Sequence, residues 1–216
     1  SVAVTPNQVA TGEAASALGS GSPIYLNLAM AGPDNVPLAL DLLSGEIHPT
    51  TGTLLIESNQ SALNVIPEYS HGPSNHVWAD VVGGWSTANG DGNAATANQS
   101  QFGAFSGLDM GLSADMNLGL MIGITDDSID VADRNSSASS NALHVGGYGR
   151  ASTGAFDLRF GGLFTTYNVD SSRAVLIADL DEILTASYGA SAMSAFGELS
   201  YNLDMQSLAV EPFLNV

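Results

Sequence analysis

The sequence contains no cysteine, no lysine and no long apolar run. Without cysteine the chain can form neither a disulfide nor a thiolate metal site. A stretch of about eighteen consecutive apolar residues is absent, which argues against a transmembrane helix. The segment beginning at Ser1 lacks the charged and apolar regions of a signal peptide. We therefore expect either a cytoplasmic protein or an internal piece of a longer precursor.

Basic residues are scarce as well. Four arginines face 22 acidic residues, which gives a formal net charge of −18. A chain with no basic patch cannot neutralise a phosphate backbone, so a nucleic-acid partner is not expected. Only 12% of the residues are charged, however, and 44% are hydrophobic. A length of 216 residues suits one large domain, or a small helical piece followed by a sheet.

Residues 1–70 carry helical signals. Thr5, Pro6 and Gln8 form a capping-box pattern that predicts a helix start. Pro49 is expected to break a helix, and Thr50 or Thr51 to cap the next one. The expected helices are Gln8–Leu18, Val36–Glu46 and Thr51–Ile66, and the apolar segment Ser22–Met30 fits either a helix or a turn.

From His76 onward the apolar period changes from 3.6 to two. In the window Gln101–Asp115 one face is glycine and polar, whereas the other is mostly apolar, as expected of an amphipathic strand. The chain also has 24 glycines, most of them in this region, which suits a barrel better than a soluble sheet. Seven strands are predicted: Val77–Ser86, Gln101–Asp115, Asn117–Asp130, Asn141–Ser152, Gly154–Asp170, Ala190–Asp204 and Gln206–Val216.

The predicted connections alternate in length. Long segments alternate with short turns near Met116, Thr153 and Asp204; the long segments are the polar residues 87–100 and 132–140 and the stretch 171–189. This alternation is typical of an all-β, antiparallel up-and-down transmembrane β-barrel. A soluble sheet shows the same alternation of faces, so a soluble secreted acidic β-rich binding module is the alternative.

Charged side chains lie on the face opposite the apolar band in strand after strand. We predict that they line a polar lumen and that Glu57, on the last helix, contacts this wall through an arginine. The residues expected at the lumen are Asp80, Asp109, Arg150, Asp157, Arg159, Glu198 and Glu211. No catalytic, cofactor or metal site is predicted. The pair Glu198 and Glu211 leaves open a glycosidase-like acid and base, and the acidic cluster Asp126, Asp127, Asp130 and Asp133 is expected to be a solvated loop.

Several segments, in order and spacing, carry a family resemblance. They are Thr5–Gln8, Leu42–His48, Val77–Trp78, Gly83–Trp85, Leu118–Leu120, His144–Gly149 and Glu211–Phe213. Together they resemble the translocator β-domain of autotransporter proteins of Gram-negative bacteria. The resemblance implies a barrel of about twelve strands in the outer membrane, of which about seven are present here.

The resemblance also implies a function and partners. Such a domain anchors an N-terminal passenger and exports it through its pore, and the barrel-assembly machinery inserts it among outer-membrane lipids. Residues 1–70 would then be the junction to the passenger, with a pore helix near 51–66, and residues 76–216 the N-terminal part of the barrel. Family members continue beyond the Glu211–Phe213 segment, so the remaining strands are expected from a further C-terminal part or from another chain.

Overall fold

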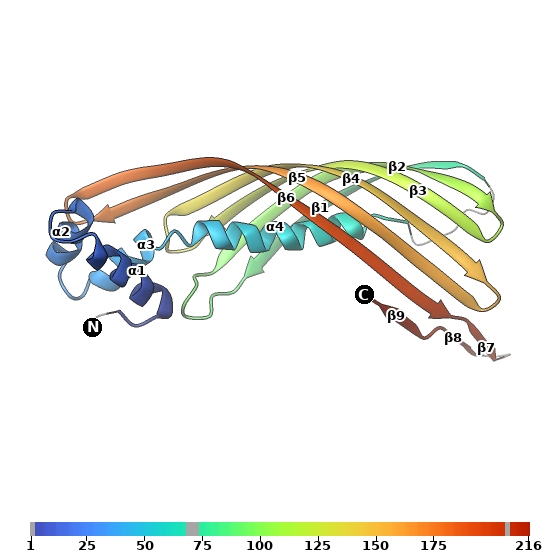
Figure 1. Cartoon of the computed structure of the whole chain (residues 1–216), viewed down its shortest axis with the longest axis horizontal. Coiled ribbons are helices and arrows are strands. Elements are labelled where there is room, and N and C mark those ends of the chain that lie inside the picture. Colours follow the sequence, from blue (N-terminus) through green and yellow to red (C-terminus); the bar gives the residue numbers. More distant parts are fainter. Residues whose placement is uncertain (1–2, 68–73, 206–207) are drawn as a thin grey trace.

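The computed structural model describes residues 3–67, 74–205 and 208–216 as a strongly curved antiparallel sheet with one long helix beneath it (Figure 1). Seven strands pair in the order β1-β2-β3-β4-β5-β6-β9, and β7 pairs with β8 separately. The strands are β1 (His76–Ala88), β2 (Ala97–Ser113), β3 (Met116–Val131), β4 (Ser136–Thr153), β5 (Phe156–Ile177), β6 (Leu180–Tyr201), β7 (Leu203–Met205), β8 (Leu208–Val210) and β9 (Phe213–Asn215). The sheet therefore has the form of a half-barrel, as predicted.

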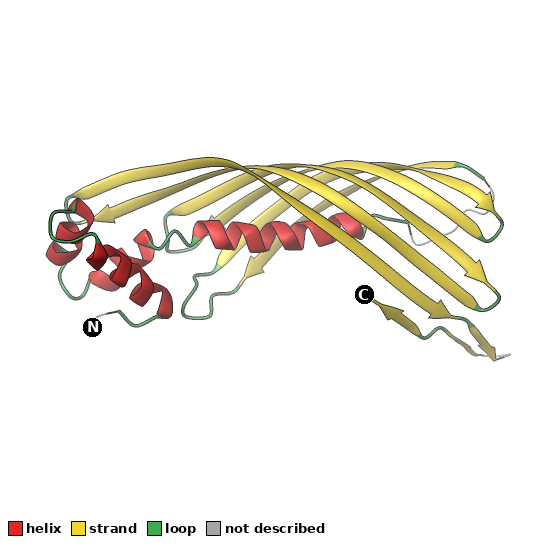
Figure 2. Cartoon of the chain, viewed as in Figure 1, coloured by secondary structure: helices red, strands yellow, loops and turns green. Residues whose placement is uncertain are grey.

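Four helices precede the sheet: α1 (Pro6–Ala17), α2 (Pro23–Met30), α3 (Val36–Leu43) and α4 (Ile47–Leu63). The predicted capping box is present, because Thr5 accepts a hydrogen bond from the Gln8 backbone and the Gln8 side chain accepts one in return. Helices α1–α3 gather at one end of the sheet, whereas α4 runs along its concave side (Figure 2). None of the described helices is long and apolar enough to cross a membrane.

The predicted start of the last helix was wrong. α4 begins at Ile47 rather than Thr51, and Pro49 lies inside its first turn. Proline is tolerated there because the first backbone N–H groups of a helix have no partner within it. The interruption between α3 and α4 lies before Pro49, at Gly45, which has a φ of 69°. α3 ends at Leu43 instead of the predicted Glu46.

The first six strands were predicted, but most extend beyond the predicted ends. The expected loop 171–189 is wrong, because β5 and β6 stay paired up to Ile177 and Leu180. Only Ala178 and Asp179 connect them, and Ala178 has a φ of 50°. Likewise β3 and β4 are joined by residues 132–135, with a φ of 61° at Asp133. Residues 136–140 are polar and resemble a loop in the sequence, although their backbone belongs to β4.

The last predicted strand, Gln206–Val216, was wrong, because this part of the chain is not one continuous strand. Residues 203–205, 208–210 and 213–215 form three short strands, and only β9 joins the main sheet, with Phe213 opposite Ser200 on β6. Pro212 precedes β9 and lacks the backbone N–H that a continuous ladder needs. Residues 206 and 207, the start of the predicted strand, lie outside the described residues.

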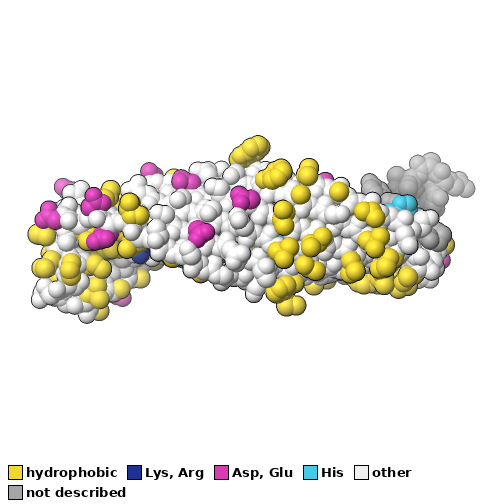
Figure 3. All heavy atoms as spheres, turned by 90° about the horizontal axis from the view of Figure 1, so that it is seen from above, with side chains coloured by type: hydrophobic (Ala, Val, Ile, Leu, Met, Phe, Trp, Pro, Cys, Tyr) yellow, Lys and Arg dark blue, Asp and Glu magenta, His cyan; other side chains and the backbone are white. Residues whose placement is uncertain are grey.

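The outward face of the sheet is divided into two halves. Toward the β4–β5 turn, the outward residues are mostly apolar and exposed; examples are Phe102, Leu120, Ile122, Ile124, Leu143, Val145, Phe160, Phe164, Met193 and Leu199. Toward the helices they are polar, as in Ser100, Ser128, Asp130, Ser137, Ser139, Asn168, Asp170 and Ser187. Seen from above, apolar side chains gather over the half of the sheet farther from α1–α3, and acidic ones over the nearer half (Figure 3).

The apolar band has the height of a membrane core. On β5 it extends from Phe156 to Phe164. Nine strand residues cover about 27 Å, or roughly 20 Å of height at a tilt of about 40°. Since membrane barrels carry an apolar band about 25 Å tall, the outward face has the pattern of a lipid-facing wall on one half only.

Candidate functional site at the inner face of the sheet

One side of α4 packs against the inner wall of the sheet along its length. The buried residues of this side are Ile47, Thr51, Leu54, Leu55, Ser58, Asn59 and Ala62. Leu54 and Leu55 enter one apolar cluster with Ile129, Val131 and Val169 of the wall. Ala62, Val65 and Ile66 enter a second with Phe105, Met121 and Leu163. The helix is thus held by two apolar contacts with a polar zone between them.

Asp127 is at the centre of that polar zone and is fully buried. Its carboxylate accepts hydrogen bonds from the Ser58 hydroxyl at 3.2 Å and from the Gln99 side-chain amide at 2.8 Å. Gln99 and Gln101 also donate to the Leu54 and Ser58 carbonyls, each at 3.4 Å. The predicted solvated acidic loop was therefore wrong for Asp127, which lies inside β3 and binds α4 through its inward-facing position.

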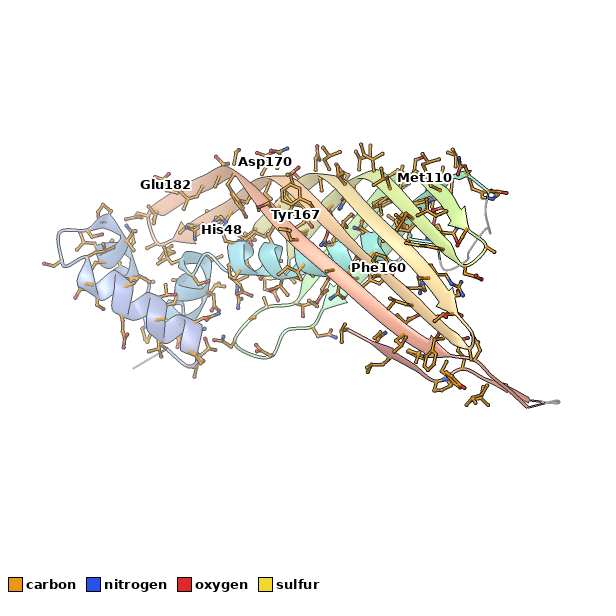
Figure 4. The ribbon with its side chains drawn as sticks, turned by 45° about the vertical axis from the view of Figure 1, so that its right-hand side comes forward. His48, Met110, Phe160, Tyr167, Asp170 and Glu182 are labelled. Carbon is orange, nitrogen blue, oxygen red and sulfur yellow. The ribbon has the colours of Figure 1, made fainter. Side chains whose placement is uncertain are left out.

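A second polar contact joins the helix directly to β5 and β6 and, through His144 and Thr125, to β4 and β3. The Thr165 hydroxyl donates to Asn59 Oδ1 at 2.6 Å, and Asn59 Nδ2 donates to Ser194 Oγ at 2.5 Å. Behind Thr165, the buried ring of His144 bridges Thr165 Oγ1 at 2.9 Å and Thr125 Oγ1 at 3.0 Å. Tyr167, labelled in Figure 4, reaches α4 from β5 and donates its hydroxyl to the Leu55 carbonyl at 3.1 Å. Since a buried polar group is costly without a partner, this chain fixes the position of the helix along its own axis.

Aromatic side chains pack on the inner face of the sheet beside the end of α4. Trp78 Nε1 donates to the Tyr148 hydroxyl at 2.6 Å, and Tyr148 in turn donates to Asp109. The ring of Tyr148 lies directly over Gly119 of the adjacent strand, where a Cβ atom could not fit. Glycine is therefore required at this position by the close approach of the ring.

A row of charged side chains crosses the inner face of the sheet close to the turn between β4 and β5. Arg150, Arg159 and Glu198 lie opposite one another on a single rung across β4, β5 and β6. Arg150 Nη2 is 2.8 Å from Asp157 Oδ1, and Arg159 Nη1 is 3.2 Å from Glu198 Oε1. Arg150 and Arg159, which lie directly opposite each other, are thus each paired with a carboxylate. This pairing matters because two like charges opposite each other destabilise a sheet.

The structure places the predicted site residues in different surroundings. Asp109, Arg150, Asp157, Arg159 and Glu198 share the inner face of the wall. Asp80 occupies an inner-face position on β1 but is exposed at the edge of the sheet. Glu211 is exposed in the connection between β8 and β9. Glu57 is exposed on a flank of α4, where it borders a hollow together with Trp85 and Gln101, and the expected ion pair with an arginine is not among the contacts of the described residues.

Uncharged residues that hold α4 were missed from the sequence. Ser58, Asn59, Gln99, His144 and Thr165 make the hydrogen bonds described above. Gln99 and His144 occupy inward positions at the same alternating period as Asp109 and Arg150, and that period was the available signal. A search confined to charged side chains passes over them.

A family model for the autotransporter beta-domain matches residues 77–216. The chain belongs to the autotransporter β-domain family. As a member it is an outer-membrane translocator domain of Gram-negative bacteria, so the predicted family, location and translocator function are confirmed. Translocator β-domains are generally non-enzymatic.

Two curated relatives of this autotransporter β-domain are each named extracellular serine protease, from Serratia marcescens. They are 31% and 30% identical over 210 residues, which is 91% of this chain and 20% of each relative. The chain therefore spans about a fifth of the length of the relatives it matches. Among solved structures, the translocator domain of autotransporter NalP from Neisseria meningitidis matches 72% of this chain and 53% of its own, with a TM-score of 0.54. At 11% identity this likeness shows a shared fold alone.

Proposed function

We propose that the sheet is one part of the wall of an export pore and that α4 fills this pore once an N-terminal passenger has crossed it. The observation that carries the proposal is the match between α4 and the inner wall. Two apolar clusters, the Asp127 contact and the Asn59 contact follow one another along the same side of the helix. A helix packed in this way both anchors the chain and blocks the pore.

The two halves of the outward face give the direction of export. α4 starts at the polar end of the sheet, next to α1–α3, and ends at the apolar end (Figure 1). If the apolar half is in the membrane, the polar half projects beyond it together with α1–α3. We assign residues 1–70 to the passenger junction and residues 76–216 to the N-terminal part of the barrel. The passenger then lies on the outer side of the membrane.

A complete pore needs more wall than the described strands supply. Within the part of the chain that the structure describes, β1 pairs on one side only, and β6 pairs with β9 over just Glu198–Ser200. Unpaired backbone groups cannot face hydrocarbon. We propose that further strands, from the rest of the protein or from another chain, complete the barrel and that the barrel-assembly machinery inserts it.

We propose that this part of the protein carries no enzyme activity. Serine protease activity, which the names of the relatives state for those proteins, would belong to the passenger. Glu198 supports this view, because it is paired with Arg159 rather than with Glu211, which is exposed outside the strands.

The test is a crosslink between α4 and the wall in the full-length protein, produced in a Gram-negative outer membrane. Ser58→Cys with Asp127→Cys should form a disulfide, because these side chains are in contact. Gln60→Cys with Asp127→Cys is the matched control, since Gln60 is exposed on the side of α4 away from the wall. The uncrosslinked barrel should also migrate differently on a gel before and after heating. Equal crosslinking of both pairs, or no heat-dependent shift, would reject the proposal.

A further inference from the structure

Helices α1–α3 contact all three connections that the described sheet has at its outer end. We name these helices, together with the connection to α4 up to Glu46, the helical cap (residues 6–46). The connections are residues 89–96 between β1 and β2, residues 132–135 between β3 and β4, and residues 178–179 between β5 and β6. The helical cap is at this end of the sheet in every ribbon view (Figures 1 and 2). Each connection is held by different chemistry.

The contact with the β5–β6 hairpin is mainly apolar. Ala39 of α3 is buried with Val175 and Ile177 on the inner face of β5, and Leu28 and Leu43 pack against this cluster. Three hydrogen bonds accompany it. Asn27 Oδ1 accepts from the backbone N–H of Asp179 at 3.0 Å. Arg173 Nη1 donates to the carbonyls of Leu42 and Leu43, at 3.3 and 3.2 Å, where a cation suits the end of α3.

The contact with the β3–β4 connection is ionic. Arg134 Nε is 2.8 Å from Glu46 Oε2, and its Nη1 is 3.5 Å from Asp41 Oδ2. The side chains are largely buried, with 14% of Arg134, 13% of Asp41 and 5% of Glu46 exposed. One cation thus neutralises two carboxylates, one on α3 and one just before α4. Without Arg134 these two carboxylates would face each other with reduced hydration.

The contact with the β1–β2 connection uses backbone groups. The Asn7 N–H donates to Asn93 Oδ1 at 2.8 Å, and the Ala95 N–H donates to Glu46 Oε1. Asp91 shapes this loop by accepting from the backbone N–H groups of Ala94 and Asn93, at 2.8 and 2.9 Å. These hydrogen bonds, of which the one from Ala94 has the larger effect, lower the pKa of the Asp91 carboxyl.

The helical cap has only a small core of its own. The structure buries Gln8 and Ala15 of α1, Asn27 of α2, and Ala39, Leu40 and Leu42 of α3. Val9, Leu18, Leu26 and Met30 stay exposed. Contacts with the three connections therefore add to a small internal core in holding the helical cap in place. A segment with few buried apolar contacts opens at low free-energy cost.

We infer that the helical cap is a lid that closes the outer mouth of the pore above α4, and that the ion pairs of Arg134 with Asp41 and Glu46 keep this lid shut. The inference rests on the proposed function. A passenger in transit needs an open mouth, so the lid is displaced during export and closes afterwards. Arg134 is suited to this role, because losing it converts an attraction at the mouth into a repulsion.

The test measures access to the lumen from outside the cell. In the full-length protein, Gly52→Cys places a thiol on α4, at a position where a Cβ atom meets nothing within 4 Å. The probe is a membrane-impermeant maleimide attached to a polyethylene glycol chain, and protein without Gly52→Cys gives the background. Ser137→Cys, exposed on the outward polar face of β4, is the matched control thiol.

Adding Arg134→Gln should raise the labelling rate at Gly52→Cys by about tenfold or more, because the rate follows the population of the open lid and loss of the ion pairs should raise that population about tenfold. It should leave the rate at Ser137→Cys unchanged. The charge swap Arg134→Glu with Glu46→Arg should return the rate toward that of the unmodified lid. The heat-dependent gel shift and the passenger at the cell surface should persist in all variants, which separates failure of the lid from failure of the translocator.

An unchanged labelling rate at Gly52→Cys, in an Arg134→Gln protein that still shows the gel shift, would overturn the lid. If Arg134→Gln fails to assemble, Asp41→Asn with Glu46→Gln removes the same ion pairs without leaving two facing carboxylates. That variant should also label faster than the unmodified lid. Labelling at the same rate would overturn the inference equally.

Discussion

Asn59 on α4 and Thr165 on β5 are joined by a hydrogen bond of 2.6 Å, although 106 positions separate them in the chain. Asn59 accepts with its carbonyl oxygen from Thr165 and donates with its amide to Ser194 at 2.5 Å. Both capacities of one amide are thus used against two strands of the wall. This fixes α4 at one height, because a shift of one helical turn leaves Asn59, Thr165 and Ser194 without these partners.

We therefore expect Asn59→Leu to destabilise the folded barrel by about 1–3 kcal/mol, because it removes the hydrogen bonds of the Asn59 amide to Thr165 and Ser194 at a buried position of the helix. Thr165→Val should cost about as much, and the two changes together should cost less than the sum. The measurement is the midpoint temperature of the heat-dependent gel shift in the full-length protein.

Gln60→Ala is the control for Asn59, because Gln60 is exposed on the other side of the same helix turn. Its midpoint should match that of the unmodified protein. If Asn59→Leu also leaves the midpoint unchanged, the amide does not fix the helix, and the apolar clusters alone hold it.

Gly119 is expected to tolerate no side chain. A Cβ atom there would overlap the ring of Tyr148, which is held by Trp78 and Asp109 and cannot easily move. Gly119→Ala should therefore destabilise the barrel by about 1–3 kcal/mol through overpacking. The midpoint of the gel shift again measures it.

Gly147 gives the matched comparison, since a Cβ atom there would be 3.7 Å from the nearest heavy atoms, in ordinary van der Waals contact. Gly147→Ala should be neutral or slightly stabilising, because alanine reduces the freedom of the unfolded chain. Equal effects of the two substitutions would show that strand propensity, rather than the Tyr148 ring, decides the residue at position 119.

The outward face predicts a depth-dependent response to charge. Ile122 is 55% exposed in the middle of the apolar band, whereas Ser128 is exposed in the polar half of the same strand. Ile122→Arg should destabilise the inserted barrel by about 2–4 kcal/mol, and Ser128→Arg by about 0–1 kcal/mol. Urea unfolding of the barrel in lipid vesicles measures both. A larger effect at Ser128 would place the membrane over the wrong half of the sheet.

The alternation of side chains was sufficient to predict the first six strands. In β2 and β3 the outward face carries the apolar band and the inner face is mostly polar or glycine, so the period of two is strong. It was not sufficient between Ser171 and Gly189. There apolar residues lie on both faces, Val175 and Ile177 on one and Leu176 and Ile183 on the other, so the hydrophobic contrast that marks a strand disappears while the pairing of β5 with β6 continues.

The inner wall was predicted where it is charged and missed where it is neutral. Arg150, Asp157 and Glu198 were found because a charge on one face of an amphipathic strand needs an explanation. Asn59 and Thr165 resemble ordinary surface residues in the sequence, and only the packing of α4 against β5 makes them buried partners. Pro49 was misjudged for a local reason, because the helix start was placed after the proline rather than before it.

In the row of charged side chains near the β4–β5 turn, loss of the acid and loss of its basic partner should have unequal effects on stability. Arg159 lies directly between Arg150 on β4 and Glu198 on β6. Glu198→Gln leaves two arginines on neighbouring positions with one carboxylate fewer, whereas Arg159→Gln removes one of the two facing cations. Like charges directly opposite each other destabilise a sheet. Glu198→Gln should therefore destabilise the barrel more than Arg159→Gln does.

The size of each effect is limited, because 20% of the Arg159 side chain and 26% of the Glu198 side chain are exposed. For such partly solvated pairs we expect about 0.5–1 kcal/mol for Glu198→Gln and less for Arg159→Gln. The difference should shrink in high salt, which screens exposed charges over about 3 Å at 1 M. Urea unfolding midpoints of the two variants at low and high salt measure both effects. If Arg159→Gln proves the more damaging, the pair with Glu198 rather than the neighbouring Arg150 controls this rung, and a double-mutant cycle should then show the full coupling between Arg159 and Glu198.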